Sequence, residues 1–475
     1  MKKIYYIASV LMTIIFVGCS KDSLEQGNNI IPDNEQVTKQ ESPASGETIT
    51  FTASAVTKSN EVTDESGSRR VAYGATDATW EAGDKIFLVK SDGTTITLTL
   101  SGGEGTTAGT FTSTDAVTAG TYTPYAVSAT ALTKGYVSIS SGVITLDLSA
   151  GGGGSLADAL EHDILKGDNI VLTDDQENAT ITGLSTHILS VIRFQFVATE
   201  KAITNIGISS TGGINQTVTI ATNGTVTGSN PTTNVITVGA SSIGSNTYSG
   251  YFAVYGSTTT SLLAHAEDVS TAKYTRLVST KTANYTAGTV YGKTFTLSSA
   301  MMNAAATGTL SSQSWKNLGL SVKWAGLSVG ASSETQYMYN IDNGTSNEAG
   351  IAVPAGWSGW RLPTRAEAQE LFYASNRQWI TGATNGVRFN CNDNYVTMGA
   401  GGYWRMRDDQ YTDDAYSVGS ALFYINENTP SNGWYAQLWA IVSSEGTALS
   451  FGSANLGTYV HSFTNYAPMR LVCDY

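Results

Sequence analysis

Apolar and polar residues alternate along most of the chain before residue 299. In the segment 48–55 the hydroxyl side chains fall on one face and the apolar side chains on the other, namely Ile49, Phe51, Ala53 and Ala55. A period of two residues is typical of a β-strand with one buried face. The pattern recurs at 96–100 and 144–148. Residues 48–185 are therefore predicted to form a β-sandwich, with the glycine run 151–154 as a flexible loop.

A second strand-rich block covers residues 186–298. Its clearest feature is a hairpin in which Val218 and Ile220 lead through Asn223-Gly224 into Val226. The Asn-Gly pair favours tight two-residue turns between antiparallel strands. This block is predicted to form a second β-sandwich.

The composition changes after the second block. Eight of the nine tryptophans lie between Trp315 and Trp439, and half of the 24 tyrosines lie beyond Trp315. Residues 299–314 are small and polar, which is typical of a linker. A third domain is therefore predicted over residues 315–475.

One stretch of this third domain, GWSGWRLPTRAEAQEL from Gly356 to Leu371, differs from the strands around it. Thr364 followed by Glu367 fits a capping box and predicts the start of a short helix. Trp357 and Trp360 either pack beneath this helix or stack on a sugar ring. Packing is favoured, because large aromatic side chains mostly fill protein cores.

Length and composition limit the class of protein. The 475 residues suffice for about three domains, and they are 41% hydrophobic, 14% charged and rich in glycine. This composition suits β-sandwiches joined by tight turns. The formal net charge of −13 argues against a nucleic-acid partner, whose phosphates would be repelled.

The first residues of the chain have the pattern of an export signal. Lys2 and Lys3 precede an apolar segment, 4–17, which as a helix would be only about 21 Å long and too short to span a bilayer. The Phe-Val-Gly-Cys sequence that ends at Cys19 resembles a bacterial lipobox. It implies a signal peptide over 1–19, lipidation of Cys19, and an outer-membrane lipoprotein held by a polar tether, 20–47. Ordinary signal-peptide cleavage is the alternative.

Two further cysteines, Cys391 and Cys473, lie in the predicted third domain. In an exported protein such thiols can form a disulfide. They can equally be buried free thiols, because the geometry decides between the two.

No arrangement of residues supports catalysis or a cofactor. The segment 326–330 fits Gly-x-Ser-x-Gly, but no convincing helix follows, as that nucleophile motif requires. The four histidines lack the spacing of metal ligands. The pairs Asp408-Asp409 and Asp413-Asp414 could bind Ca²⁺, although a solvated acidic loop is the simpler interpretation. The chain is therefore expected to be neither an enzyme nor a cofactor-binding protein.

Three motifs in the first two blocks resemble the marks of the fimbrillin-like proteins of Bacteroidales. They are Ala78-Thr-Trp80-Glu-Ala-Gly-Asp84-Lys-Ile86, His187-Ile-Leu-Ser-Val-Ile-Arg193-Phe194 and Asn284-Tyr285-Thr-Ala-Gly288-Thr-Val-Tyr291. The resemblance covers residues 48–298. It implies two transthyretin-like β-sandwiches in a surface lipoprotein that builds type V pili.

The third domain is similar to the major paralogous domain first described from Fibrobacter. The similarity rests on Leu318 to Ala331, on Gly359-Trp-Arg-Leu-Pro-Thr364 and on Gly402-Tyr-Trp404 and Met469-Arg470-Leu-Val472. It implies a C-type-lectin-like α+β fold. The fold class is thus mostly β, with two transthyretin-like sandwiches followed by an α+β domain. The sequence departs from the family at Trp404-Arg-Met-Arg407, where small hydroxyl residues are usual.

The resemblance also implies a mechanism. In type V pili a protease removes the first strand of the N-terminal sandwich, and a strand from a neighbouring pilin subunit fills the groove. Arg69-Arg70 is the candidate processing site, with a plain basic loop as the alternative. Shaft pilins carry the donor strand at the C-terminus, where this chain has a whole domain. We therefore expect a subunit of the pilus tip.

The partner beyond the pilus is expected to be a host or bacterial surface ligand, either a glycan or a protein. Four aromatic residues are candidates for the ligand surface, namely Trp357, Tyr411, Trp434 and Tyr435. Two other roles stay open, which are an uncleaved outer-membrane lipoprotein that binds glycans for uptake and a pilus anchor held by its lipid.

Overall fold

The structure, a computed structural model of the chain, divides into two units, Met1–Ser42 and Pro43–Tyr475, and every described residue belongs to the second. It describes 49–55, 61–63, 69–72, 79–174, 176, 178–258, 261–279, 283–333, 353, 355–380, 386–399, 404–405, 435–441, 446–452, 456–459, 465–466 and 470–475. Cys19, Tyr411, Trp434 and the aspartate pairs 408–409 and 413–414 lie outside these residues. Of Tyr435 the structure describes only the backbone, in a strand.

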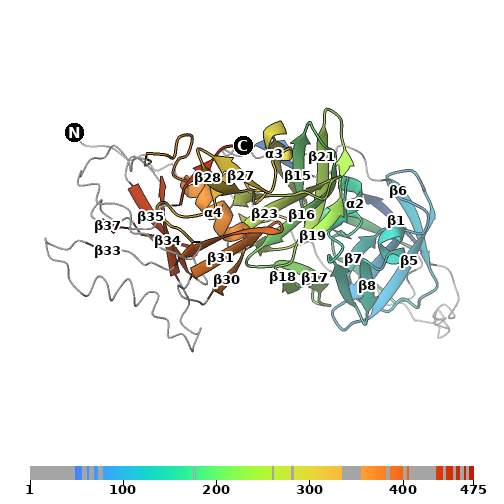
Figure 1. Ribbon diagram of the computed structural model, residues 1–475. Helices are drawn as coiled ribbons and strands as arrows, with labels where there is room; N and C mark the ends of the chain where they lie inside the picture. Colours follow the sequence, from blue (N-terminus) through green and yellow to red (C-terminus); the bar gives the residue numbers. More distant parts are fainter. Residues whose placement is uncertain are drawn as a thin grey trace, which may run out of the picture. The chain divides into compact units, whose positions relative to one another are not determined.

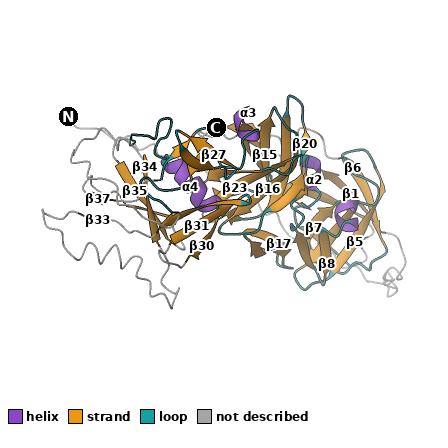
Figure 2. Ribbon diagram, in the orientation of Figure 1, coloured by secondary structure: helices purple, strands orange, loops and turns teal. Residues whose placement is uncertain are grey.

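Strands dominate the described part of the chain (Figure 2). The helices are short, namely α1 (Ala129–Thr133), α2 (Leu156–Leu160), α3 (Ser299–Met302) and α4 (Arg365–Ala374). A serine or threonine side chain caps each of them by accepting a hydrogen bond from a backbone N–H of the first turn. Among the described residues, none of the helices has the length and apolar character needed to cross a bilayer.

The largest sheet has nine strands and forms one layer of the first sandwich. Its order is β13 (Asn178–Leu184), β1 (Ile49–Ala55), β6 (Ala108–Ser113), β5 (Thr95–Gly102), β4 (Lys85–Lys90), β7 (Gly120–Val127), β11 (Leu165–Lys166) and β14 (Thr186–His187), with β12 (Ile170–Leu172) also beside β7. The strand β1 runs antiparallel to β6 and parallel to β13. The first described strand, β1, is therefore an interior strand of the sheet, beside β6 (Figure 1).

The opposite layer of the first sandwich is built partly by the second block. Its order is β18 (Val226–Thr232), β17 (Ile214–Ile220), β9 (Val143–Asp147) and β8 (Val137–Ser140). Val218 and Ile220, from the predicted Asn-Gly hairpin, pair with Leu146 and Ile144 and are buried in the core between the layers. The boundary that we predicted between residues 185 and 186 therefore does not separate the cores, because the core of the first sandwich contains side chains from both blocks.

The second sandwich likewise takes strands from the first block. One layer has the order β10 (Gly152–Gly153), β21 (Thr247–Val254), β15 (Ser190–Ala198), β26 (Thr289–Leu297), β3 (Arg69–Ala72) and β2 (Glu61–Thr63), with β20 (Ser241–Ser242) also beside β21. The other is β19 (Ile236–Gly239), β16 (Ile203–Ser210), β23 (Leu262–Asp268) and β24 (Lys273–Ser279). A small ladder joins β22 (Ser257–Thr258) to β25 (Ala283–Asn284). Phe194, Phe196 and Phe252 lie in the core between the layers.

The glycine run 151–154 differs from the flexible loop that we predicted. Gly152 and Gly153 form β10 and pair with Phe252 and Tyr251. A β-carbon on Gly151 would lie 2.5 Å from Cγ2 of Ile236. The run is rich in glycine because β10 packs too closely against its neighbours for side chains.

Residues 299–314 also differ from the predicted linker. Met301 and Met302 of α3 are buried in the second core. The next strand, β27 (Thr307–Leu310), opens a sheet that continues through β28 (Gln313–Lys316), β29 (Lys323–Ala325) and β38 (Val472–Cys473). The third domain therefore follows the second without an extended connection.

The rest of the third domain surrounds α4. One three-stranded sheet has the order β30 (Asn376–Ile380), β31 (Gly386–Cys391) and β32 (Asn394–Gly399), and another has the order β34 (Tyr435–Ile441), β35 (Gly446–Gly452) and β36 (Leu456–Tyr459). A two-stranded sheet joins β33 (Trp404–Arg405) to β37 (Asn465–Tyr466). Leu371 and Phe372 of α4 pack with Trp324 and Phe389 in one buried cluster. In the described part of this domain, α4 and the strands around it thus share one core.

Candidate functional site

The candidate functional site is the position of β1 in the first sandwich. Phe51 pairs with Phe111 of β6 on one side and with Ala179 of β13 on the other. Ala53 pairs in the same way with Gly109 and Ile181. Because β1 has partners along both edges, its absence would leave two rows of backbone groups without their hydrogen bonds.

The inward side chains of β1 are fully enclosed. Phe51 is 0% exposed and Ala53 is 3% exposed, whereas the outward hydroxyl of Thr52 lies 3.3 Å from that of Thr180. The predicted alternation is thus confirmed for these three residues. Burial of one phenylalanine and one alanine contributes roughly 2–4 kcal/mol. The site without β1 would be a long apolar groove.

Trp80 lies at the part of this groove that holds Ala53, next to its pairing partner Gly109. Its ring meets Phe111 edge to face, with centroids 4.9 Å apart and an interplanar angle of 82°. Its Nε1 donates to the carbonyl of Thr107 over 3.1 Å. A β-carbon on Gly109 would lie 2.9 Å from Cδ1 of Trp80 and 2.7 Å from Cε2 of Phe111. The indole therefore fills the space that a side chain at position 109 would need.

Asp84 fixes the turn that carries Trp80. One carboxylate oxygen accepts from the backbone N–H of Glu81, and the other accepts from that of Ala129, both over 2.9 Å. Gly83, which lies between Glu81 and Asp84 in the sequence, has a φ of 90°, a conformation that favours glycine. The Trp-Glu-Ala-Gly-Asp motif is thus a structural support for one end of the groove.

Sequence reasoning singled out Trp80 but not Gly109. The signal was present, because Ala108-Gly-Thr-Phe-Thr-Ser113 alternates like a strand with a glycine at an inward position. A glycine inside a strand often marks a close approach by another group. The identity of that group, Trp80, depends on a contact across 29 residues of sequence that no local pattern reveals.

The candidate processing residues, Arg69 and Arg70, lie in a strand. Arg70 pairs with Val62 of β2 on one side and with Tyr291 of β26 on the other. The first block therefore places β1 in one sandwich and the arginine pair in the other, one strand in from the edge of its sheet. A protease needs an extended, unpaired segment, so β3 would have to leave its sheet before either peptide bond could be cut.

Trp357 is buried in the structure. It is 7% exposed and Trp360 is 5% exposed, and the two rings meet edge to face with centroids 5.2 Å apart. The Nε1 of Trp360 donates to the carbonyl of Leu310 over 3.1 Å. This burial favours core packing of Trp357 over stacking on a sugar ring.

The Arg-Leu-Pro-Thr segment begins α4, as predicted. Thr364 and Glu367 form the capping box. The guanidinium of Arg361 donates to both carboxylate oxygens of Glu367, over 2.7 and 2.8 Å, and also to Asp474 over 2.8 Å. The backbone of Arg361 pairs with Val472. The motif therefore ties the helix to the last strand of the sequence and has a structural role.

The third domain is joined to the second sandwich by buried polar contacts. Glu370 of α4 accepts from the backbone N–H of Ser321 over 2.7 Å and from that of Leu277 in β24 over 3.3 Å. Thr275 of β24 donates its N–H to the carbonyl of Gly319 over 2.9 Å. Because these bonds lie in buried surroundings, we expect the two domains to move as one body.

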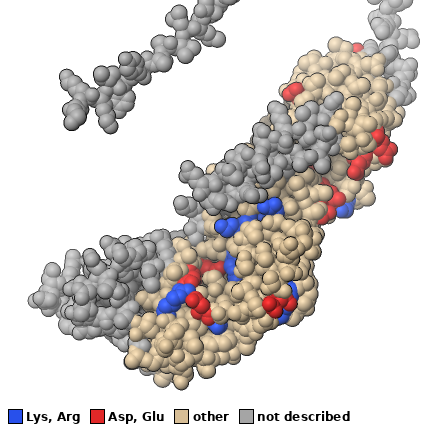
Figure 3. Space-filling view, turned by 90° about the horizontal axis from the view of Figure 1, so that it is seen from above, with Lys and Arg blue, Asp and Glu red and all other residues tan. Residues whose placement is uncertain are grey.

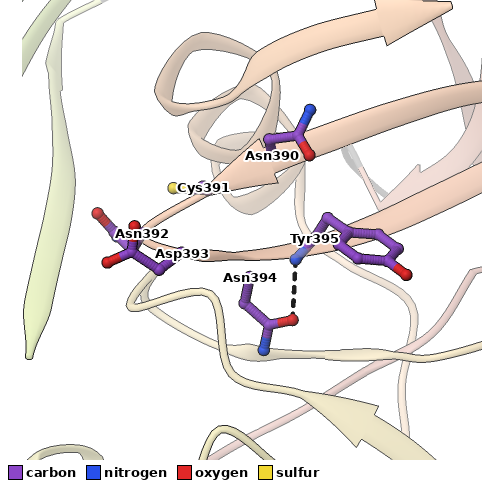
Figure 4. Close-up of a pocket in the computed structure, with 6 residues that line it drawn as sticks. All are labelled: Asn390, Cys391, Asn392, Asp393, Asn394 and Tyr395. Carbon is purple, nitrogen blue, oxygen red and sulfur yellow. Dashed lines mark hydrogen bonds between the residues drawn. The ribbon is translucent and has the colours of Figure 1, made fainter.

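A small pocket at the turn between β31 and β32 belongs to this joint (Figure 4). Asn392 donates to the carbonyl of Leu318 over 2.7 Å, and Asn394 donates to that of Asn317 over 3.1 Å. Asp393 forms an ion pair with Lys273 of β24. The polar groups around the pocket thus have partners within the chain.

Both cysteines of the third domain are buried free thiols in the structure, so the second of the two alternatives holds there. They lie in different buried clusters, Cys391 with Phe389 and Cys473 with Trp357. Burial raises the pKa of the Cys391 thiol to about 12. Such a thiol is poorly reactive.

The other residues considered for chemistry have structural partners. His162 stacks on Tyr136, and His187 forms a 2.7 Å ion pair with Asp163. Ser328 of the Gly-x-Ser-x-Gly segment is 3% exposed. Within the described ranges no three His, Cys, Asp or Glu side chains gather as metal ligands would. On the face shown in Figure 3, charged side chains form small groups on a largely uncharged surface.

Neither the protein-family models nor the curated proteins give a match to this sequence. Among solved structures, the chain is similar to a proposed cell adhesion protein from Bacteroides ovatus, with 14% identity, 52% of this chain and 91% of that chain covered, and a TM-score of 0.34.

Two fimbrial proteins from Porphyromonas gingivalis are also similar in structure. The tip fimbrial protein Mfa3 is 11% identical over 49% of this chain and 82% of that chain, with a TM-score of 0.26. The fimbrial anchor protein Mfa2 is 10% identical over 46% and 78%, also with a TM-score of 0.26.

Proposed function

We propose that this chain is a cell-surface fimbrial adhesin subunit that accepts a strand from a neighbouring subunit at the position of β1. The observation that carries the proposal is that the first strand of the body is an interior strand. It is paired along both edges and its inward side chains are buried. Once the chain is cut after β1, this segment can leave the sandwich while the chain that follows it stays covalently intact.

The energetics favour replacement of β1 over an empty groove. Loss of β1 exposes the pockets of Phe51 and Ala53 and leaves the facing edges of β6 and β13 unpaired. Domains are stable by only about 5–15 kcal/mol, so an empty groove would be sticky or partly unfolded. A strand from another subunit restores both the backbone pairing and the burial, as in other cases of β-strand addition.

The end of the sequence is not arranged as a donor. The last strand, β38, pairs with β29 inside the third domain. The hydroxyl of Tyr475 donates to Asn317 over 2.7 Å, and its ring packs against the core of the second sandwich. Residues 472–475 are therefore engaged within the chain. This engagement of residues 472–475 supports the tip role in our proposal, because a tip subunit accepts a strand and need not lend one.

In this proposal the third domain carries the adhesive surface, and its ligand is a glycan or a protein on a host or bacterial cell. The lipid on Cys19 and the export signal bring the chain to the outer membrane before assembly. The buried joint to the second sandwich transmits load from the ligand to the filament without a flexible hinge.

Immunogold electron microscopy of intact filaments tests the proposal. Antibody against the third domain should label one end of each filament. Label spread evenly along filaments, or absent from them, would contradict a tip role.

A second role is favoured by one observation. Arg69 and Arg70 lie in β3, paired on both sides, which protects them from a protease. An uncleaved surface lipoprotein that binds glycans would keep β1 in place. Mass spectrometry of the N-terminus of the mature protein on cells separates the two roles, because only the pilus role removes β1.

A further inference from the structure

We propose that the β1 groove selects its partner strand by size, taking a bulky apolar side chain at the position of Phe51 and only a small one at the position of Ala53. This inference rests on the proposed function and names the partner that fits the site. The partner is an extended segment of another protein with the order bulky, hydroxyl, small.

The first pocket is deep. Phe51 is completely buried and lies between Phe111 of β6 and Ala179 of β13. The small side chain of Ala179 on one flank leaves room for a ring. A partner that lacks a large apolar group here would leave a cavity, which weakens its binding.

The second pocket is shallow. Ala53 pairs with Gly109, and the side-chain space above Gly109 is already filled by Trp80, Phe111 and Leu100. Each of these three residues has an atom within 3.0 Å of the place of a β-carbon at position 109. A leucine at position 53 would have to displace this cluster, and Trp80 is anchored by hydrogen bonds to the carbonyl of Thr107 and, through its backbone, to that of Thr106. The rigid indole therefore excludes bulky side chains.

The outward face adds little selectivity. Thr52 is exposed, and its hydroxyl lies 3.3 Å from that of Thr180. An alanine in place of Thr52 loses this exposed hydrogen bond, which contributes little because water competes for it. This position supplies a matched control for the two inward positions.

A strand-exchange assay on the full chain tests the size rule. A specific protease site placed between β1 and β2 lets the folded protein be cut while β1 stays bound. A fluorescent peptide with the sequence of residues 48–56 then exchanges with the resident strand, and unlabelled variants compete. The variants are Phe51→Ala, Ala53→Leu and the control Thr52→Ala.

We expect the Thr52→Ala peptide to compete within about threefold of the native peptide. The Phe51→Ala and Ala53→Leu peptides should each be at least tenfold weaker. A Trp80→Phe chain, which frees space beside Gly109, should regain affinity for the Ala53→Leu peptide; if that chain does not fold, Leu100→Ala serves the same purpose.

Equal competition by the native and Ala53→Leu peptides would overturn the size rule and leave strand acceptance standing. Exchange of no peptide, the native one included, would overturn strand acceptance as well. The two failures are thus distinguishable.

Discussion

Ala53 of β1 lies directly opposite Gly109 of β6, and the ring of Trp80 fills the space where a side chain at position 109 would be. The three residues come from separate strands and turns, yet together they set the depth of the groove. In our proposal this strand glycine limits which side chains the sandwich accepts at the position of Ala53.

The Gly109→Ala variant should be destabilised. Its β-carbon would meet Phe111 at 2.7 Å and Trp80 at 2.9 Å. Overpacking of this kind costs about 1–3 kcal/mol. Chemical denaturation followed by tryptophan fluorescence measures the change. The matched control is Gly239→Ala, another strand glycine, which has nothing within 4 Å of its β-carbon and should change stability by less than about 0.5 kcal/mol. Equal effects at the two positions would contradict the packing account.

The protein should lose stability between about pH 6.5 and pH 4. His265 lies partly buried between the hydroxyls of Ser209, 2.7 Å away, and Thr275, 3.1 Å away, and desolvation of the ring lowers its pKa to about 4. In this window the unfolded chain binds a proton at His265 and the folded chain does not, so stability falls as the pH falls. The total is about 3 kcal/mol.

Denaturation curves at a series of pH values check this prediction. The His265→Gln variant cannot titrate at that position, so its free energy of unfolding should fall by about 3 kcal/mol less between pH 6.5 and pH 4 than that of the parent chain. If the free energy of unfolding of the variant depends on pH as steeply as that of the parent chain, other groups cause the pH dependence.

The joint between the second and third domains should depend on Glu370. Its carboxylate is buried and accepts hydrogen bonds from Ser321 and Leu277. Glu370→Ala leaves those donors without partners, at a cost of about 2–4 kcal/mol. The exposed Asp393, in an ion pair with Lys273, is the control, and Asp393→Asn should cost about 0–1 kcal/mol, because asparagine tolerates the φ of 66° at this position. Calorimetry measures both, and a similar loss in both variants would contradict a buried joint.

Intact protein should resist cleavage at Arg69 and Arg70. Both residues belong to β3, and Arg70 has a paired strand on each side. A proline has no N–H to donate and is excluded from the interior of a sheet. Ala72 of β3 pairs with Thr289 of β26. Ala72→Pro should therefore release β3 and speed cleavage at least tenfold in a timed digest with an arginine-specific protease, because it leaves the peptide bonds after Arg69 and Arg70 unchanged. Parent chain cut as fast as the variant would show that β3 does not protect the site.

Local patterns predicted the elements better than their partners. The alternation of residues 48–55 correctly predicted the strand and its buried face, because a strand must turn one face to the core. The spacing of Thr364 and Glu367 correctly predicted the start of α4, because capping is a contact across three residues.

Long-range partners were beyond reach of the same reasoning. The hairpin around Asn223-Gly224 was predicted, but its pairing with β9 of the first block depends on contacts more than 70 residues apart. The glycines of 151–154 were interpreted as flexibility, whereas close packing explains them. At the site, Phe51 and Ala53 were predicted as inward residues, but the contact between Gly109 and Trp80 required the tertiary structure.

The most direct measurement of strand acceptance uses a photo-reactive residue at position 180. In the chain by itself the Thr180 hydroxyl lies 3.3 Å from that of Thr52, so a cross-link at this position captures the strand that occupies the groove. Irradiation of assembled filaments, followed by mass spectrometry, should yield position 180 joined to a segment of a different protein. Position 180 joined only to residues 49–55 of its own chain would contradict the account.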